Sequence, residues 1–234
     1  SVYAHSSGIP FEVIGPFMAN PNSVADQDKT HQIPRLPVEE TETKTTTGLG
    51  AIGVWVDGTA IFNWQDGMSY NNQGVWNQNA NYWEGPSLDG CGAHPPPSGE
   101  YHTHAAPVCV MNRLDDEGGN HSPLLGWSYD GLPIYGPWGY AIPDGTGGIE
   151  RMKSSWNIRN ITQRTHYADG TDVADGPTIA TSPLGAYRED FEYVDGLGDL
   201  DEHNGRFAVT PEYPEGVYHY RVTIDANGDG VFPY

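Results

Sequence analysis

Residues 50–64 read GAIGVWVDGTAIFNW, and this stretch decides the fold class. Gly50 to Val56 and Thr59 to Trp64 are apolar runs with β-branched and aromatic residues, which are enriched in strands. Asp57-Gly58 lies between them, and this dipeptide is a strong signal of a tight hairpin turn. The stretch therefore predicts two antiparallel strands.

The same pattern occurs again further along the chain. Leu124 to Tyr129 and Leu132 to Tyr135 flank Asp130-Gly131, which predicts a second hairpin, and Val217 to Ile224 predicts a further strand. Glycine and proline number 30 and 19 among 234 residues, too many for a helical protein because both break helices. We expect an all-β, loop-rich fold with few short helices, arranged as a single-domain sandwich or distorted barrel.

Composition divides the chain into two parts. Glu39 to Thr47 is polar and Thr-rich with no apolar face, so we interpret residues 1–48 as an N-terminal arm and residues 49–234 as one β-rich domain. Residues 66–84 are rich in Asn, Gln, Gly and aromatic residues, which favours a long loop with room for a short helix. Arg151 to Arg164 fits either a strand or a short helix.

The charge balance limits the partners. The chain carries 31 acidic and 11 basic residues, a formal charge of -20. Without a basic face to neutralise phosphates, nucleic acid is not an expected partner, and neither is an anionic membrane surface. No apolar run approaches the length of a membrane span, so we expect no membrane insertion.

The two cysteines bracket a histidine-rich segment. Cys91 and Cys109 enclose His94 to His104, and a disulfide between them would close a loop around that segment in an oxidising compartment. Two free thiols, or thiolates that help to bind a metal, are the alternatives. We favour the disulfide, and with it a secreted, extracellular or periplasmic protein.

The tetrapeptide Tyr101-His102-Thr103-His104 carries the strongest chemical signal. In a strand, side chains alternate between faces, so His102 and His104 would point the same way and share one metal ion. His121 follows a Gly-rich turn and would supply a third nitrogen, with His94 and His219 in reserve. Imidazole suits copper and zinc alike. The competing interpretation is a hydrogen-bonded structural network of imidazoles.

Other polar residues are candidates for supporting roles. Asp130 and Asp201 would orient ligands or shuttle protons, and Arg206 would position an anionic group of a substrate. Turn-capping explains both aspartates equally well. Asp225, Asn227 and Asp229 match the first half of a calcium loop, but the glutamate due at its twelfth position would fall beyond the last residue.

Several short motifs, in order, resemble those of the YHYH-domain proteins, a largely uncharacterised group of secreted or surface proteins. The resemblance spans roughly residues 50–234 and implies a compact secreted β-rich domain with a shared polar cluster, without naming a reaction. Thr103 occupies a position where the family usually has Tyr, and Arg221 occupies one where the second tetrapeptide often continues with His. The matching pieces are residues 88–94 (LDGCGAH), 101–104 (YHTH), 126–136 (GWSYDGLPIYG), 184–190 (LGAYRED), 199–206 (DLDEHNGR), 218–220 (YHY) and 232–234 (FPY).

These observations predict a secreted metalloprotein with a mononuclear histidine site. As an enzyme it would be a copper oxidoreductase or a zinc hydrolase or lyase, acting on a small molecule or a polysaccharide. The alternative is a non-catalytic extracellular module for adhesion, binding or metal capture, in which the Tyr-His motifs form a structural network.

Overall fold

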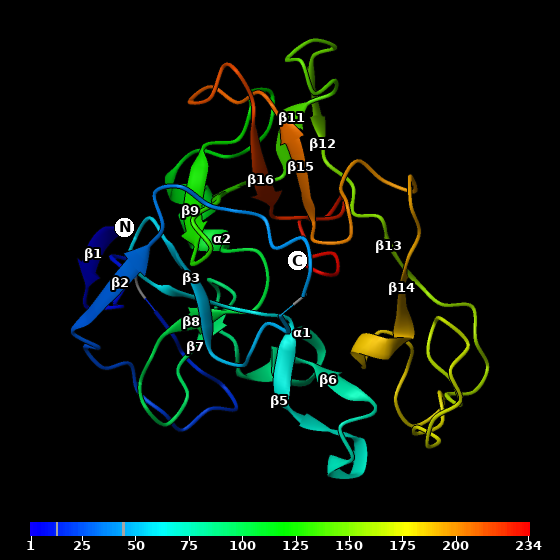
Figure 1. Cartoon of the computed structure of the whole chain (residues 1–234). Coiled ribbons are helices and arrows are strands. Elements are labelled where there is room, and N and C mark those ends of the chain that lie inside the picture. Colours follow the sequence, from blue (N-terminus) through cyan, green and yellow to red (C-terminus); the bar gives the residue numbers. More distant parts are fainter. Residues whose placement is uncertain (13, 44) are drawn as a thin grey trace.

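The computed structural model describes residues 1–234 apart from residues 13 and 44 (Figure 1). It confirms the all-β, loop-rich fold. Its main sheet has the strand order β15-β16-β10-β9-β3-β4-β8-β7, so it is open, with β15 and β7 at its edges, and is not a closed barrel. The strands are β3 (Ala51–Trp55), β4 (Ala60–Phe62), β7 (Ala93–His94), β8 (His102–Thr103), β9 (Leu124–Ser128), β10 (Pro133–Tyr135), β15 (Gly205–Ala208) and β16 (Val217–Arg221).

Smaller elements surround this sheet. Among the described residues, four two-stranded sheets pair β1 with β2, β5 with β6, β11 with β12, and β13 with β14. These strands are β1 (Val2–Ser6), β2 (Lys29–Ile33), β5 (Gln65–Ser69), β6 (Asn77–Asn79), β11 (Trp138–Tyr140), β12 (Ile149–Arg151), β13 (Trp156–Ile158) and β14 (Phe191–Tyr193). The helices are α1 (Ala80–Trp83), α2 (Val108–Arg113) and the 3-10 turns η1 (Tyr70–Asn72), η2 (Gly85–Ser87) and η3 (Arg188–Asp190).

Both predicted hairpins are confirmed, and their turns share one construction. β3 pairs with β4 and β9 with β10, each antiparallel. Asp57 and Asp130 each accept a hydrogen bond from the backbone N–H two residues further on. Gly58 and Gly131 adopt φ of +88° and +97°, a conformation that favours glycine. The Asp-Gly signal therefore places both turns correctly.

The main sheet consists of two similar halves. β3 and β9 pair antiparallel at its centre, with Val54 opposite Trp127. Outward from β3 lie antiparallel β4, then parallel β8, then antiparallel β7; outward from β9 lie antiparallel β10, then parallel β16, then antiparallel β15. We call β3, β4, β7 and β8 the first half and β9, β10, β15 and β16 the second half (Figure 1). An approximate two-fold axis between β3 and β9 relates them.

The sequences of the two hairpins obey the same symmetry. Residues 52–62 (IGVWVDGTAIF) align with residues 125–135 (LGWSYDGLPIY), so Gly53 is equivalent to Gly126. A Cβ on Gly53 would lie 2.6 Å from the Trp127 carbonyl oxygen, and one on Gly126 would lie 2.6 Å from that of Val54. Glycine is therefore required on both sides of the axis, because the two backbones approach too closely for a side chain.

The core lies between this sheet and α2. Trp55, Ile61, Leu125 and Ile134 come from the two hairpins, and Val110 of α2 packs against them. The expected disulfide joins Cys91 to Cys109 and so ties the turn before β7 to α2. The ambiguous region 151–164 contains the end of β12 and the strand β13.

The N-terminal segment 1–48 contributes the paired strands β1 and β2, and residues 15–22 between them run along the first half. The backbone N–H of Gly15 donates to Asp89, and the amides of Asn20 and Asn22 both donate to the Pro95 carbonyl. These contacts bring the segment beside β7, next to the histidine residues of the first half.

Candidate metal centre

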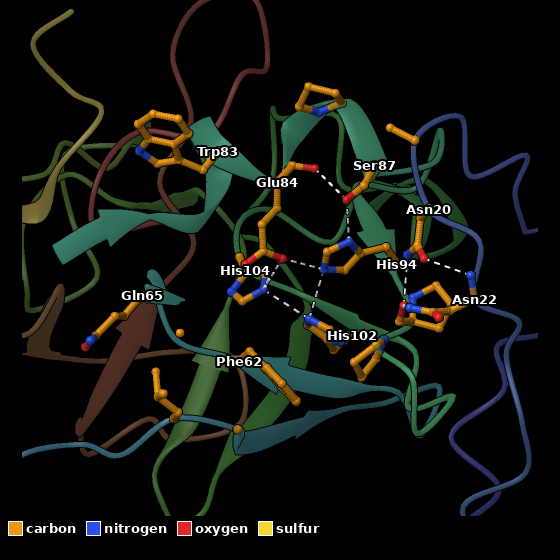
Figure 2. A pocket seen from close by; sticks show the side chains of 17 residues that line it. Asn20, Asn22, Phe62, Gln65, Trp83, Glu84, Ser87, His94, His102 and His104 are labelled. Carbon is orange, nitrogen blue, oxygen red and sulfur yellow. Dashed lines mark hydrogen bonds and ion pairs between the residues drawn. The ribbon is translucent and has the colours of Figure 1, made fainter. Parts of the chain in front are cut away.

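Four side chains of the first half meet at one point (Figure 2). His94 ends β7, His102 begins β8, His104 follows β8 and Glu84 follows α1. Strand alternation puts His102 and His104 on one face, as expected, and the β7–β8 register sets His94 directly opposite His102. One ligand atom from each of the four residues lies within 4.8 Å of the others, and the three imidazoles are buried.

Hydrogen bonds on the far side of each ring fix its orientation and its tautomer. The Nδ1–H of His102 donates to the Glu100 carbonyl at 2.9 Å, and that of His104 to the Asn63 carbonyl at 2.6 Å. A carbonyl only accepts, so both Nδ1 atoms carry the proton and both Nε2 atoms carry a lone pair when the rings are neutral.

Ser87 imposes the same tautomer on His94. Its hydroxyl donates to the Glu84 carbonyl at 2.7 Å, so the oxygen accepts from Nδ1 of His94 at 2.6 Å. All three rings therefore direct an Nε2 lone pair toward the centre. This arrangement of outer hydrogen bonds is typical of metal-ligating histidine.

The short distances between these lone pairs would suit a bound cation. Nε2 of His102 lies 3.1 Å from Nε2 of His94 and 3.0 Å from Nε2 of His104, with no proton available between neutral rings. Glu84 Oε2 completes the set, at 2.8 Å from His94 and 3.4 Å from His104. Either a metal ion or an added proton must occupy the centre to offset the repulsion of four electron-rich atoms.

Electrostatics keep the donors in the form that binds metal. Burial alone would raise the pKa of Glu84, but when Nε2 of His104 and His94 carries a proton, the hydrogen bonds and charge of these rings outweigh burial and hold that pKa well below its usual range. Burial lowers the pKa of His102 to about 3, and His104 adds to the effect. At neutral pH Glu84 is therefore a carboxylate and His102 a neutral imidazole.

A cavity opens over the centre. It has a volume of about 510 Å³, and all four donor residues line it together with Phe62, Trp83 and the N-terminal Asn20 and Asn22 (Figure 2). The Phe62 ring stacks on the His102 ring with centroids 3.8 Å apart. The centre is thus accessible from one side, and a volume of this size suits a small molecule.

A comparison against protein families matches residues 30–229 to the YHYH protein family. The match agrees with the histidine geometry and the paired Tyr-His strands. The chain belongs to the YHYH family. Searches of curated proteins and of solved structures found no match. The family match covers nearly the whole chain, so the two Tyr-His strands lie within one family domain.

The structure places the other two candidate histidines in the second half. His219 lies on β16, and its Nδ1–H donates to the Val217 carbonyl at 2.9 Å. His121 precedes β9, and its Nε2 accepts from Arg221 at 2.7 Å. Neither belongs to the group of four that meets at Glu84.

The proposed supporting residues also lie in or beside the second half. Asp130 accepts from the Tyr220 hydroxyl at 2.6 Å, and Asp201 from the Tyr218 hydroxyl at 2.8 Å. Arg206 donates to the Tyr140 carbonyl at 3.1 Å. The structure therefore brings His94, His102 and His104 together and keeps these three residues apart from them.

The acidic C-terminal loop forms a compact turn. Asp225 accepts hydrogen bonds from the backbone N–H groups of Asn227 and Asp229, at 2.7 and 3.0 Å. One of its oxygens is thus occupied by the loop itself. Calcium binding at Asp225, Asn227 and Asp229 remains a prediction.

Sequence reasoning missed Glu84. It belongs to a loop region with no strand alternation, ten residues before His94, and is brought to the centre by α1 and the turn η2 (Gly85–Ser87). Its nearest signal was the clustering of polar residues beside Trp83.

None of the helices in the described part of the chain is long and apolar enough to cross a membrane.

Proposed function

We propose that the chain is a secreted metalloprotein that holds one transition-metal ion between Glu84, His94, His102 and His104. The observation that carries this proposal is the convergence of three Nε2 lone pairs and a carboxylate oxygen at separations of 2.8–3.4 Å. Ligand atoms at about 2.0–2.1 Å from one ion are about 2.9–3.4 Å apart for right-angled to tetrahedral geometry. The donors need little rearrangement to bind.

The arrangement of the donors favours copper(II). The short contacts between donors form a ring in the order Glu84, His94, His102, His104 and back to Glu84. Across this ring, Glu84 does not come within 4.0 Å of His102. A ring with long diagonals is typical of square-planar or tetragonal coordination, which copper(II) prefers. Zinc, which prefers a tetrahedron with six similar edges, is the second candidate.

A metal in this position would have an open side. The cavity over the centre would admit water or a small substrate, so oxidation chemistry follows for copper and hydrolysis or hydration for zinc. Trp83 and the polar Asn20, Asn22 and Gln65 would contact the substrate, which is consistent with a small polar molecule or a sugar unit. The Cys91–Cys109 disulfide supports a secreted, extracellular or periplasmic location.

The test is elemental analysis of tag-free protein, followed by copper(II) and zinc(II) titration by calorimetry. We expect one ion per chain, tighter binding of copper, and an electron paramagnetic resonance spectrum of tetragonal copper with nitrogen ligands. His102→Gln should abolish uptake. His219→Gln is the matched control, because it removes the equivalent histidine of the second half and should leave the stoichiometry at one.

The alternative is a metal-free hydrogen-bonded network. The Glu84–His94 contact at 2.8 Å supports it, because a proton on Nε2 would satisfy both groups. Under this alternative neither metal binds in the wild type and His102→Gln only lowers stability. That result would refute the metalloprotein proposal and leave a structural or binding module.

A further inference from the structure

The second half contains a counterpart of the metal centre. In the first half His94 pairs across the strands with His102, and in the second half Arg206 pairs with His219 in the same register. His104 and Arg221 each lie two residues further along the same strand. The equivalent pairs are His94 and Arg206, His102 and His219, and His104 and Arg221.

The hydrogen bonds around these residues follow the same symmetry. His102 and His219 both donate through Nδ1 to the carbonyl two residues earlier in the chain, at 2.9 Å in each case. His104 donates to the carbonyl of Asn63, and Arg221 donates to that of the equivalent Gly136. The frame is thus the same, whereas two ligand histidines are replaced by arginines.

Each of the three equivalent positions of the second half carries one buried polar atom without a partner among the described residues. They are Nε of Arg206, Nε2 of His219 and Nε of Arg221. His219 is 0% exposed and Arg221 2%. All three residues that correspond to the histidine ligands therefore carry a buried unpartnered atom.

The charge at this place is also unbalanced. Arg221 donates to the Gly136 and Trp138 carbonyls and to His121, and no carboxylate of the described residues pairs with it within 4.0 Å. Arg206 donates to Met152 Sδ and the Tyr140 carbonyl, also without a carboxylate partner. Arg221 is buried and Arg206 is half-buried, and a buried guanidinium group without an ion-pair partner is costly.

The two cations affect each other. Burial lowers the pKa of Arg221 to about 9, and the positive charge of Arg206 lowers it further. The pKa of Arg206 is also lowered by burial, against the opposing effect of Asp199. Asp199 raises the pKa of Arg206 and Asp116 that of Arg221, but neither carboxylate offsets the effect of burial.

We propose that Arg206, His219 and Arg221 hold one halide-sized anion, chloride in ordinary media, at the position equivalent to the metal of the first half. The two Nε–H groups donate to it. His219 donates through Nε2 after taking one proton from solvent, because its Nδ1 proton is already given to the Val217 carbonyl. Sulfate or phosphate does not suit the site, since three donors would leave several buried oxygens unbonded.

One neighbour of the cluster lines a cavity. A second cavity, of about 370 Å³, is lined by His121, which bonds Arg221. The titratable and charged groups that face the cluster from neighbouring elements are His121, Asp116, Tyr135, Glu212 and Asp199. Since Glu212 already accepts from the Tyr135 hydroxyl at 2.8 Å, it is not the missing counter-ion.

The decisive test is anomalous diffraction from crystals grown with sodium bromide in place of chloride. We expect a bromide peak within hydrogen-bond distance of Nε of both arginines. A peak elsewhere only, or none, overturns the proposal. The test does not depend on metal binding, so it can fail while the metal proposal stands.

Thermal unfolding tests the same site in solution. The wild type is compared in sodium chloride and sodium gluconate at equal ionic strength, with a Tm about 3 °C or more higher in chloride. Arg206→Gln should lose this difference. Arg113→Gln, which removes an exposed arginine paired with Glu12, is the matched control and should keep it. Equal Tm of the wild type in both salts overturns the proposal, whatever the variants do.

Discussion

The two halves of the main sheet share a backbone frame but differ in what its central residues attract. In the first half, His94, His102 and His104 direct lone pairs at one point and Glu84 adds a negative charge. In the second half, two arginines stand in place of two histidines. By our two proposals, one frame presents electron-rich atoms to a cation, and the other presents N–H donors to an anion.

The comparison teaches that the frame and the ligand chemistry are separate. Strand register and Nδ1 hydrogen bonds are common to both halves, so they specify where side chains meet. The three residues at the meeting point then decide which ion is favoured. Each prediction below either tests whether the frame is truly shared or separates the chemistry of the halves.

The largest effect is expected at the axis between the halves. Gly53→Ala and Gly126→Ala each bring a Cβ to 2.6 Å from a carbonyl of the facing strand, so each should destabilise the protein by about 3 kcal/mol in urea unfolding. Gly67→Ala, where a Cβ meets nothing within 4 Å, should be nearly neutral. A large difference between the first two variants would contradict the two-fold relation.

A smaller effect is expected from the paired tyrosines. Tyr101 donates to Asp89, and Tyr218 donates to Asp201 in the equivalent position. Tyr218→Phe should cost about 2 kcal/mol, a typical value for a hydrogen bond to a charged group. Tyr101→Phe should cost about 1 kcal/mol, because the same oxygen of Asp89 keeps the bond from Gly15 N–H. Unfolding free energies in urea give both values, and the reverse order would contradict this reasoning.

Much of the frame could be predicted from sequence because its signals are local. Asp57-Gly58 and Asp130-Gly131 mark turns through residues that are adjacent in the chain, and alternation in a strand places His102 and His104 on one face. The Tyr-His motifs at residues 101–104 and 218–220 can be read from the sequence, but the parallel pairing of each motif's strand with a hairpin strand cannot. That pairing depends on long connections without periodic signals.

The fourth ligand and the charge of the second site depend on tertiary structure. Glu84 reaches the centre through a four-residue helix and a 3-10 turn, neither of which has an amphipathic pattern. From the sequence, Arg206 was predicted to position an anionic group of a substrate, because the sequence does not reveal that Arg221 lies close to it. Only the register of β15 against β16 brings them together.

The next largest effect is expected at Ser87, which orients the proposed ligand His94 from outside the metal centre. Ser87 accepts the Nδ1 proton of His94, so Ser87→Ala should weaken metal binding by about tenfold. Competition titration with a chromogenic chelator measures the change. Ser128→Ala, a hydroxyl of the second half whose hydrogen bond is 3.5 Å long, should leave the affinity unaltered. Equal affinities of all three proteins would show that Ser87 does not orient the ligand.

The smallest predicted effect is the part of the pH dependence that His219 contributes. Burial, with the charge of Arg221, lowers the pKa of His219 to about 3 in the folded protein, against 6.5 for an unperturbed histidine. Between these values the unfolded chain binds a proton that the folded protein does not, so this stability is complete above about pH 6.5 and is lost as pH falls toward 3. In gluconate, the wild type should lose about 1 kcal/mol more than His219→Gln between pH 7 and pH 5.5.

Chloride sharpens this last comparison. An anion bound between Arg206 and Arg221 stabilises the protonated form of His219, so it raises the folded pKa and reduces the loss. Urea unfolding at both pH values, in chloride and in gluconate, should therefore give a smaller wild-type loss in chloride and no salt difference for His219→Gln. An identical pH dependence of the two proteins in gluconate would mean that His219 titrates normally. Burial and the charge of Arg221 would then not perturb the pKa of His219.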